Sequence, residues 1–157
     1  MPDVSLDLQL MLSHFFYLGV AFLLTLPIAF NREQNARGAG LRTFPLVAIA
    51  SCAFMLVAKD VYQGSEAEAR VMYGVITGIG FIGGGAIVRE SGRVGGTATA
   101  AGIWITGALG VAVAYAHYEI AIILSAFSFV IFQFFRYFKK NPAVARSEGI
   151  VKEKPGT

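Results

Sequence analysis

The stretch GIGFIGGG, from Gly78 to Gly85, decides the fold class. The glycines at its first, third and sixth positions give G-x-G-x-x-G, a spacing that lets a backbone approach a dinucleotide pyrophosphate. That motif needs a preceding strand and an acidic residue roughly 20 residues later. No Asp or Glu lies between Gly92 and Tyr118, and the stretch sits inside the uncharged run 71–88. We therefore interpret these glycines as part of a membrane helix.

Long stretches without Asp, Glu, Lys or Arg make up most of the chain. Of the 157 residues, 55% are hydrophobic and 15% are charged, against about 45–50% and about 25% in soluble domains. The uncharged runs are 8–30, 71–88, 94–118 and 120–135. Runs of about 18 or more apolar residues are typical of transmembrane helices. The sequence predicts a multi-pass protein whose first partner is the lipid bilayer.

An all-α bundle of five transmembrane helices is expected within residues 1–140, with a flexible cytoplasmic tail at 141–157. The spans are predicted at about Leu8–Phe30, Leu41–Ala58, Val71–Val88, Thr97–Tyr118 and Ile120–Tyr137. The second is the weakest, because its apolar part 44–58 rises only about 22 Å, less than a hydrocarbon core of roughly 30 Å. Extending it back to Leu41 makes it long enough.

The basic residues predict the orientation of this bundle. Five spans leave only Lys59 and Arg70 on one side and place the other basic residues opposite them: Arg32, Arg37, Arg42, Arg89, Arg93, Arg136, Lys139, Lys140, Arg146, Lys152 and Lys154. Lys and Arg are retained on the cytoplasmic side of a membrane. The amino terminus is therefore expected outside and the carboxyl terminus inside, and the positive charge does not require nucleic acid as a partner.

The glycines of the third span predict close helix packing, because small residues let membrane helices approach each other. At about 100° per residue they form two faces, one with Gly74, Gly78 and Gly85 and one with Gly80 and Gly84. The fourth span has a small ridge at Ala98, Gly102, Thr106, Gly110 and Ala114. Two small faces suit a central helix packed between neighbours, so we expect the third and fourth helices to meet through Gly78 and Gly102, with the second face left for another helix or subunit. Alternatively, the glycines at 83–85 break or loosen the helix near the cytoplasmic side, and the unwound backbone lines a cavity that can coordinate an ion.

A capping box is expected where the third helix begins, because Ser65 and Glu68 have the S-x-x-E spacing. The two histidines, His14 and His117, lie toward the outer face without ligands at metal spacing, so an interfacial role is favoured for both. Cys52, the only cysteine, lies in an apolar run and is expected to be buried.

Polar residues gather at the predicted inner ends of the spans. The candidates that could meet there are Asn31, Arg32, Glu33, Arg42, Arg89 and Glu90. They either anchor the helices and pair their charges, with Arg42 and Arg89 as the nearest opposite charges to Glu33, or form a polar cluster that closes a cavity or presents a docking face. Glu33 and Glu90 are the candidate metal ligands, since Mg²⁺ is commonly bound through one or two carboxylates and waters.

At these positions the sequence resembles the MgtC/SapB family of bacterial inner-membrane proteins. The resemblance covers about 29–110 and is carried by Asn31-Arg32-Glu33, Ala39–Thr43, Arg70, Gly78–Arg89 and Gly96–Trp104. Asn31 replaces an acidic residue, Gly84 replaces Ala, and Thr97-Ala98 replaces Leu-Thr, which leaves Thr99 as the matching threonine. The resemblance implies functional roles for the matching polar residues, including Thr99 and Arg70, for which Asp60 or Glu66 in the same loop is the expected partner.

The resemblance also implies a function. Such proteins are linked to magnesium limitation, acid stress and survival in hosts, and some regulate other membrane complexes, including the proton-translocating ATP synthase. It favours a regulator that forms homo-oligomers or binds another membrane complex, with a magnesium or other ion transporter as the alternative. No enzymatic activity is expected, and the only candidate cofactor is Mg²⁺. Larger members carry a cytoplasmic carboxyl-terminal domain, for which 157 residues leave no room.

Overall fold

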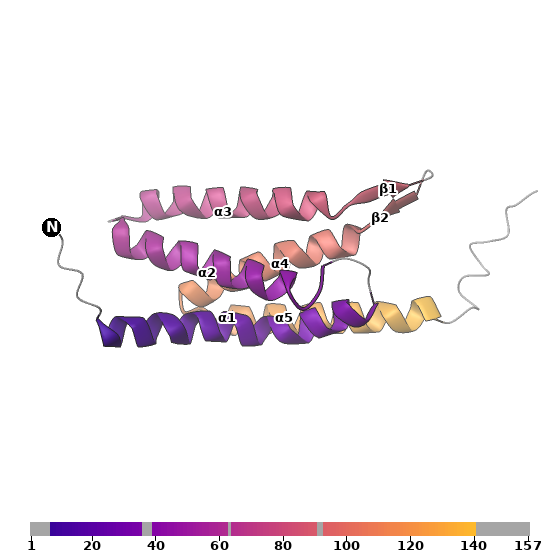
Figure 1. Cartoon of the computed structure of the whole chain (residues 1–157), viewed down its shortest axis with the longest axis horizontal. Helices are drawn as coiled ribbons and strands as arrows, with labels where there is room; N and C mark the ends of the chain where they lie inside the picture. Colours follow the sequence, from indigo (N-terminus) through magenta and orange to yellow (C-terminus); the bar gives the residue numbers. More distant parts are fainter. Residues whose placement is uncertain (1–6, 36–38, 63, 91–92, 141–157) are drawn as a thin grey trace, which may run out of the picture.

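The computed structural model describes residues 7–35, 39–62, 64–90 and 93–140, which form five helices and one β-hairpin (Figure 1). The elements are α1 (Leu8–Asn35), α2 (Thr43–Val61), α3 (Ser65–Gly85), β1 (Val88–Glu90), β2 (Arg93–Gly95), α4 (Thr97–Ala114) and α5 (Tyr118–Lys140). The predicted helical fold is confirmed, and the predicted tail at 141–157 lies outside the described residues.

The membrane character is also supported, although not for every helix alike. Among the described residues, α1, α2 and α4 are long and apolar enough to cross a membrane by length and composition, while the apolar part of α5 is the shorter Tyr118–Phe134. The helix α2 begins two residues after Leu41 and runs beyond Ala58 to Val61. The three residues added at its end more than replace the two lost at its start, so α2 has 19 residues.

The helices pack in three layers (Figure 1). The helix α3 lies on one side, α2 and α4 fill the middle, and α1 and α5 lie on the other side. The buried core follows this order, because Ile103, Leu109 and Val113 of α4 are almost fully buried. On α3 only Ile79 and Gly83 are buried. The expectation that the third helix is central to the bundle is therefore wrong.

The glycines of α4 pack against α2 and α5 rather than against the glycines of α3. A Cβ atom at Gly102 would lie 2.7 Å from Phe44 of α2 and 3.1 Å from Phe132 of α5. At Gly110 it would overlap the carbonyl oxygen of Ala48 in α2. The closest backbone approach in the bundle is thus between α2 and α4, and the predicted Gly78–Gly102 contact is wrong.

The helices α3 and α4 meet elsewhere, through Ile79 over Gly107 and through Gly83 against the backbone of Ala100. The remaining glycines of α3 are exposed, and a Cβ atom would meet nothing within 4 Å at Gly74, Gly78, Gly80, Gly84 or Gly85. Both small faces that the sequence predicted on this helix are therefore open to its surroundings within the described chain.

A β-hairpin connects α3 to α4 where the sequence predicted the third span to continue to Val88. The helix ends at Gly85, and the N–H groups of Ala86 and Ile87 donate to the carbonyls of Gly83 and Gly84. The strands β1 and β2 then pair antiparallel, with Arg89 opposite Val94. The helix therefore breaks directly after the glycine run, as the alternative predicted, and the ion cavity stays a prediction.

Candidate functional site

Arg32, in the last turn of α1, joins three helices at the predicted inner end of the bundle. Its Nη2 donates a hydrogen bond to the hydroxyl of Thr99 in the first turn of α4. Its guanidinium carbon lies 4.9 Å from the ring centroid of Phe132 in α5, within the distance for a cation–π interaction. Its Nε is buried without a hydrogen-bond partner. The family-matched residues Arg32 and Thr99 are thus brought into direct contact.

Asn31 lies beside Arg32 in sequence but faces α5. Its side chain is buried, and its Nδ2 donates to Oε1 of Gln133 over 2.8 Å. An amide can both donate and accept hydrogen bonds, whereas an ionised carboxylate at this position could only accept. Neither Gln133 nor Phe132 was identified from the sequence, because both lie in an otherwise apolar run.

Glu33 is exposed and serves the connection between α1 and α2. Its Oε2 accepts a hydrogen bond from the N–H of Leu41 over 2.9 Å, and its side chain occupies the space where Gly40 would carry a Cβ atom. The expected charge pairing with Arg42 or Arg89 is wrong, since no ion pair among the described residues joins them. Arg42 and Arg89 are both exposed.

The assignment of Glu33 and Glu90 as metal ligands stays a prediction. No group of three or more His, Cys, Asp and Glu side chains that could hold a metal ion occurs in the part of the chain that the structure describes. The carboxylate of Glu33 accepts a hydrogen bond from a backbone N–H, and the side chain of Glu90 lies outside the described residues.

We expect Thr99→Val to destabilise the protein, because it leaves a partly buried Arg32 N–H without its acceptor. An unsatisfied buried donor costs about 1–3 kcal/mol, which lowers the melting temperature of a chain of this size by at least about 2 °C. Thr99→Ser keeps the hydroxyl and should melt close to the wild type. Equal melting temperatures of the valine and serine variants in detergent would contradict the role assigned to this bond.

A second polar group, at the predicted outer end, ties α3 to the middle layer. Lys59 of α2 donates to the carbonyl of Ala114 over 3.1 Å and lies 5.2 Å from the ring centroid of Tyr115. The hydroxyl of Tyr115, just beyond α4, donates to Oε2 of Glu68 over 2.7 Å. Burial and the neighbouring Glu68 raise the pKa of Tyr115 to about 12, so the phenol stays a neutral donor.

The predicted capping box of Ser65 and Glu68 is wrong. The N-cap residue of α3 is Gly64, and no side chain caps the helix. Glu68 instead accepts from Tyr115, an interaction that local sequence spacing could not reveal because the partners are 47 residues apart. The start of α3 at Ser65 agrees with the predicted start.

Arg70 lies at the predicted outer end of the bundle, away from the polar residues at the other end. It pairs with Glu66, one of its two expected partners, over 2.6 Å, and both side chains are about four-fifths exposed. Exposed pairs of this kind contribute about 0–1 kcal/mol. The other expected partner, Asp60, pairs with His14 over 3.3 Å, and His117 pairs with Glu119, which agrees with interfacial positions for both histidines.

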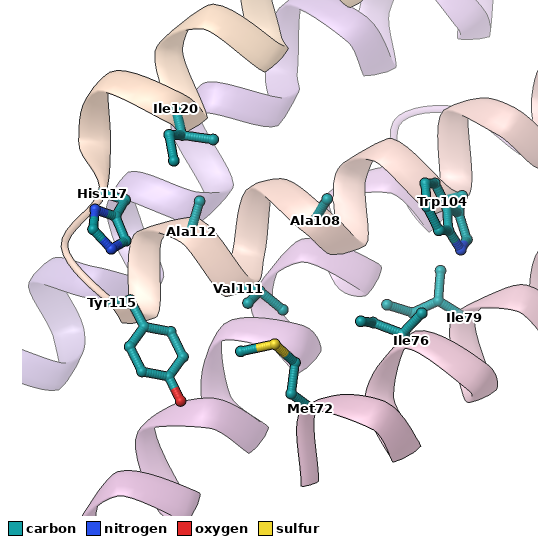
Figure 2. A pocket seen from close by; sticks show the side chains of 10 residues that line it. All are labelled: Met72, Ile76, Ile79, Trp104, Ala108, Val111, Ala112, Tyr115, His117 and Ile120. Carbon is teal, nitrogen blue, oxygen red and sulfur yellow. The ribbon is translucent and has the colours of Figure 1, made fainter. Parts of the chain in front are cut away.

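Two apolar hollows flank α3. The first, of about 410 Å³, lies between α3 and α4 and is lined by Met72, Ile76, Ile79, Trp104, Ala108, Val111, Ala112, Tyr115, His117 and Ile120 (Figure 2). The second, here called the α2–α3 groove, has a volume of about 740 Å³ and is lined by Thr43, Leu46, Val47, Ala50, Ser51, Phe54, Val71, Gly74, Val75, Gly78, Ile79 and Ile82. The peripheral position of α3 creates both.

Comparison with known proteins identifies the family. The model of the MgtC family matches residues 18–141. The protein named "Putative magnesium transporter YhiD" from Escherichia coli K12 is 35% identical over 115 residues, 69% of this chain and 54% of that protein. Protein SrpB from Synechococcus elongatus is 36% identical over 126 residues, which cover 72% of this chain and 69% of SrpB.

Protein MgtC from Brucella abortus strain 2308 is 42% identical over 91 residues, 58% of this chain and 38% of that protein. The chain thus spans about half the length of the first of these relatives and less of the last. No solved structure matches. The family match covers most of the chain, including α1 from Leu18 onward, all of α2 to α5 and the Arg32–Thr99 contact. The chain therefore belongs to the MgtC family.

Proposed function

We propose that this chain is a five-span protein of the bacterial inner membrane that acts by binding another membrane protein. In this proposal the amino terminus lies outside and the carboxyl terminus inside, as the distribution of basic residues predicts. The observation that carries it is the open face of α3 with Gly80 and Gly84, where a Cβ atom would meet nothing within 4 Å. Exposed small residues on a membrane helix favour close approach of a second helix.

The interior of the bundle offers little support for an ion path. The buried hydroxyls of Thr25, Ser51, Thr106 and Ser128 donate to carbonyls of their own helices, and that of Ser125 donates to Leu24 of α1. They are therefore already satisfied and do not need an ion or water to complete their bonding. At the inner end, the charge of Arg32 would repel an entering cation.

The physiological setting follows from family resemblance. Members of this type are associated with magnesium limitation and acid or host stress, so we propose that the partner is a membrane complex regulated under those conditions. The transport alternative is favoured by one specific observation, the name of the relative from Escherichia coli K12. The two functions differ in whether α3 contacts protein and whether magnesium crosses the membrane.

A photo-crosslinking residue at Phe81 tests the binding proposal, because this α3 side chain is 85% exposed. We expect it to crosslink to a protein in living cells grown in low magnesium. The matched control is the same probe at Phe15 of α1, which is 76% exposed on the opposite layer. Equal crosslinking from both positions, or lipid adducts alone from Phe81, would contradict a specific partner surface on α3.

Magnesium flux into proteoliposomes tests the alternative. We expect the full chain to give no flux above empty vesicles. Glu33→Gln should keep the bond to Leu41, because glutamine retains an acceptor oxygen, whereas Glu33→Ala should lose it. A double variant that exchanges the charges of Glu33 and Arg89 should not restore the bond to Leu41 that Glu33→Ala loses. Flux that Glu33→Gln abolishes at normal protein level would favour transport over binding.

A further inference from the structure

The α2–α3 groove is apolar along its length. It runs from Thr43 to Phe54 on α2 and from Val71 to Ile82 on α3, so its walls belong to helices of the proposed membrane region. The hydroxyl of Ser51, the most buried polar group in its lining, donates to the carbonyl of Val47 over 2.7 Å and is already satisfied. The groove therefore suits a hydrocarbon occupant.

The size of the groove selects a chain-like occupant over a helix. Its volume is about 740 Å³, within the range of about 300–1,000 Å³ that is usual for ligand pockets. A membrane-spanning helix about 10 Å wide and about 30 Å long fills more than about 2,000 Å³. Gly74 and Gly78 leave space on the α3 side, and Leu46 and Phe54 are more than half exposed at the rim. The groove thus opens toward the hydrocarbon.

The charges at its two ends differ. At the outer end, Arg70 precedes Val71 and is neutralised by Glu66. At the inner end, Arg42 precedes Thr43, is exposed, and forms no ion pair with any residue that the structure describes. The nearby carboxylate of Glu33 is turned to the N–H of Leu41. A basic residue beside a cytoplasmic-side groove favours an anionic head group.

We propose that the α2–α3 groove binds an anionic phospholipid of the inner leaflet, with an acyl chain along Gly74 and Gly78 and the phosphate diester at Arg42. This inference rests on the orientation proposed above but not on the identity of a protein partner. A bound lipid would also fill the space beside α3, the least buried helix of the bundle, and so hold α3 against α2.

The lipid is tested with the purified full chain in detergent by native mass spectrometry and thermal melting. Phosphatidylglycerol and phosphatidylethanolamine with identical acyl chains are added separately, and inorganic phosphate forms a third arm. We expect phosphatidylglycerol to be retained more strongly and to raise the melting temperature more than phosphatidylethanolamine. Equal effects of the two lipids, or the same rise with inorganic phosphate, would overturn the proposal.

Two pairs of variants locate the site. Arg42→Gln should reduce the retention of phosphatidylglycerol about fivefold, the effect of roughly 1 kcal/mol per basic residue at an anionic surface, whereas Arg89→Gln should not. Gly78→Leu should fill the groove and abolish retention of phosphatidylglycerol. Gly80→Leu, at an equally open position that does not line the groove, should retain phosphatidylglycerol as strongly as the wild type. Equal losses within either pair would overturn the assigned site, and failure to find a protein partner would leave this result unaffected.

Discussion

Gly110→Ala is expected to remove most of the folded protein from the membrane. The added methyl group would overlap the carbonyl oxygen of Ala48 and lie 3.1 Å from the backbone nitrogen of Cys52. These are backbone atoms of a packed helix, so α2 itself must move. Overpacking in a core costs about 1–3 kcal/mol when side chains can adjust, and a clash with backbone places this substitution at or above the upper end.

The measurement compares membrane-inserted yield and melting temperature in detergent for Gly110→Ala and Gly84→Ala. At Gly84 a Cβ atom meets nothing within 4 Å, and alanine is a better helix former than glycine by about 1 kcal/mol. The control should therefore be at least as stable as the wild type. A Gly110→Ala variant that melts within about 1 °C of that control would show that α2 and α4 are not in backbone contact.

This pair of substitutions also shows what small-residue spacing can predict. The ridge of α4 containing Gly102 and Gly110 was identified correctly as a packing face. Its partner was not, because spacing along one helix contains no information about which neighbour meets it. The glycines of α3 led to the prediction that α3 packs on this ridge. The actual partner is α2, which contributes Ala48 and Cys52 from an ordinary apolar run.

The candidate site was predictable to a similar extent. Charge patterning and the family motif selected Arg32 and Thr99, which are 67 residues apart yet joined by a hydrogen bond. Their partners Phe132 and Gln133 required the packing of α5 on α1, which no local pattern specifies. Exposed charges such as Arg42 and Arg89 could not be paired from the sequence, since long side chains at helix ends can point to water instead.

The start of the hairpin after α3 was missed because the hydrophobic run of the helix continues into its first strand, and charged residues appear only at Arg89, Glu90 and Arg93. Val88 and Val94 have no charge to mark a helix end, and the hydrophobic run continues through Ala86 and Ile87. The helix α3 ends because of the backbone conformation around the hairpin and not because of a change in hydrophobicity. A substitution at Gly96 tests this conformation.

Gly96→Ala is expected to destabilise the protein nearly as strongly as Gly110→Ala. Gly96 is the N-cap residue of α4 and has φ +82°, a left-handed conformation that costs other residues roughly 1–2 kcal/mol. A Cβ atom there would also overlap the carbonyl oxygen of Ala86 and lie 3.3 Å from Cα of Ile87. The two costs arise independently, from backbone strain and from steric overlap, so they should add.

The neighbouring Gly95 provides the control, because it is the last residue of β2 and a Cβ atom there would make only an ordinary contact, 3.8 Å from the carbonyl oxygen of Val88. Gly95→Ala should therefore keep near-normal yield and melting temperature. Gly96→Asn separates the two costs at Gly96, since asparagine tolerates the left-handed region better than alanine but carries the same Cβ atom. If Gly96→Asn melts between Gly96→Ala and the wild type, both costs operate. If Gly96→Ala instead matches Gly95→Ala, the hairpin does not hold the start of α4 as described, and the placement of Thr99 beneath Arg32 would lose its structural basis.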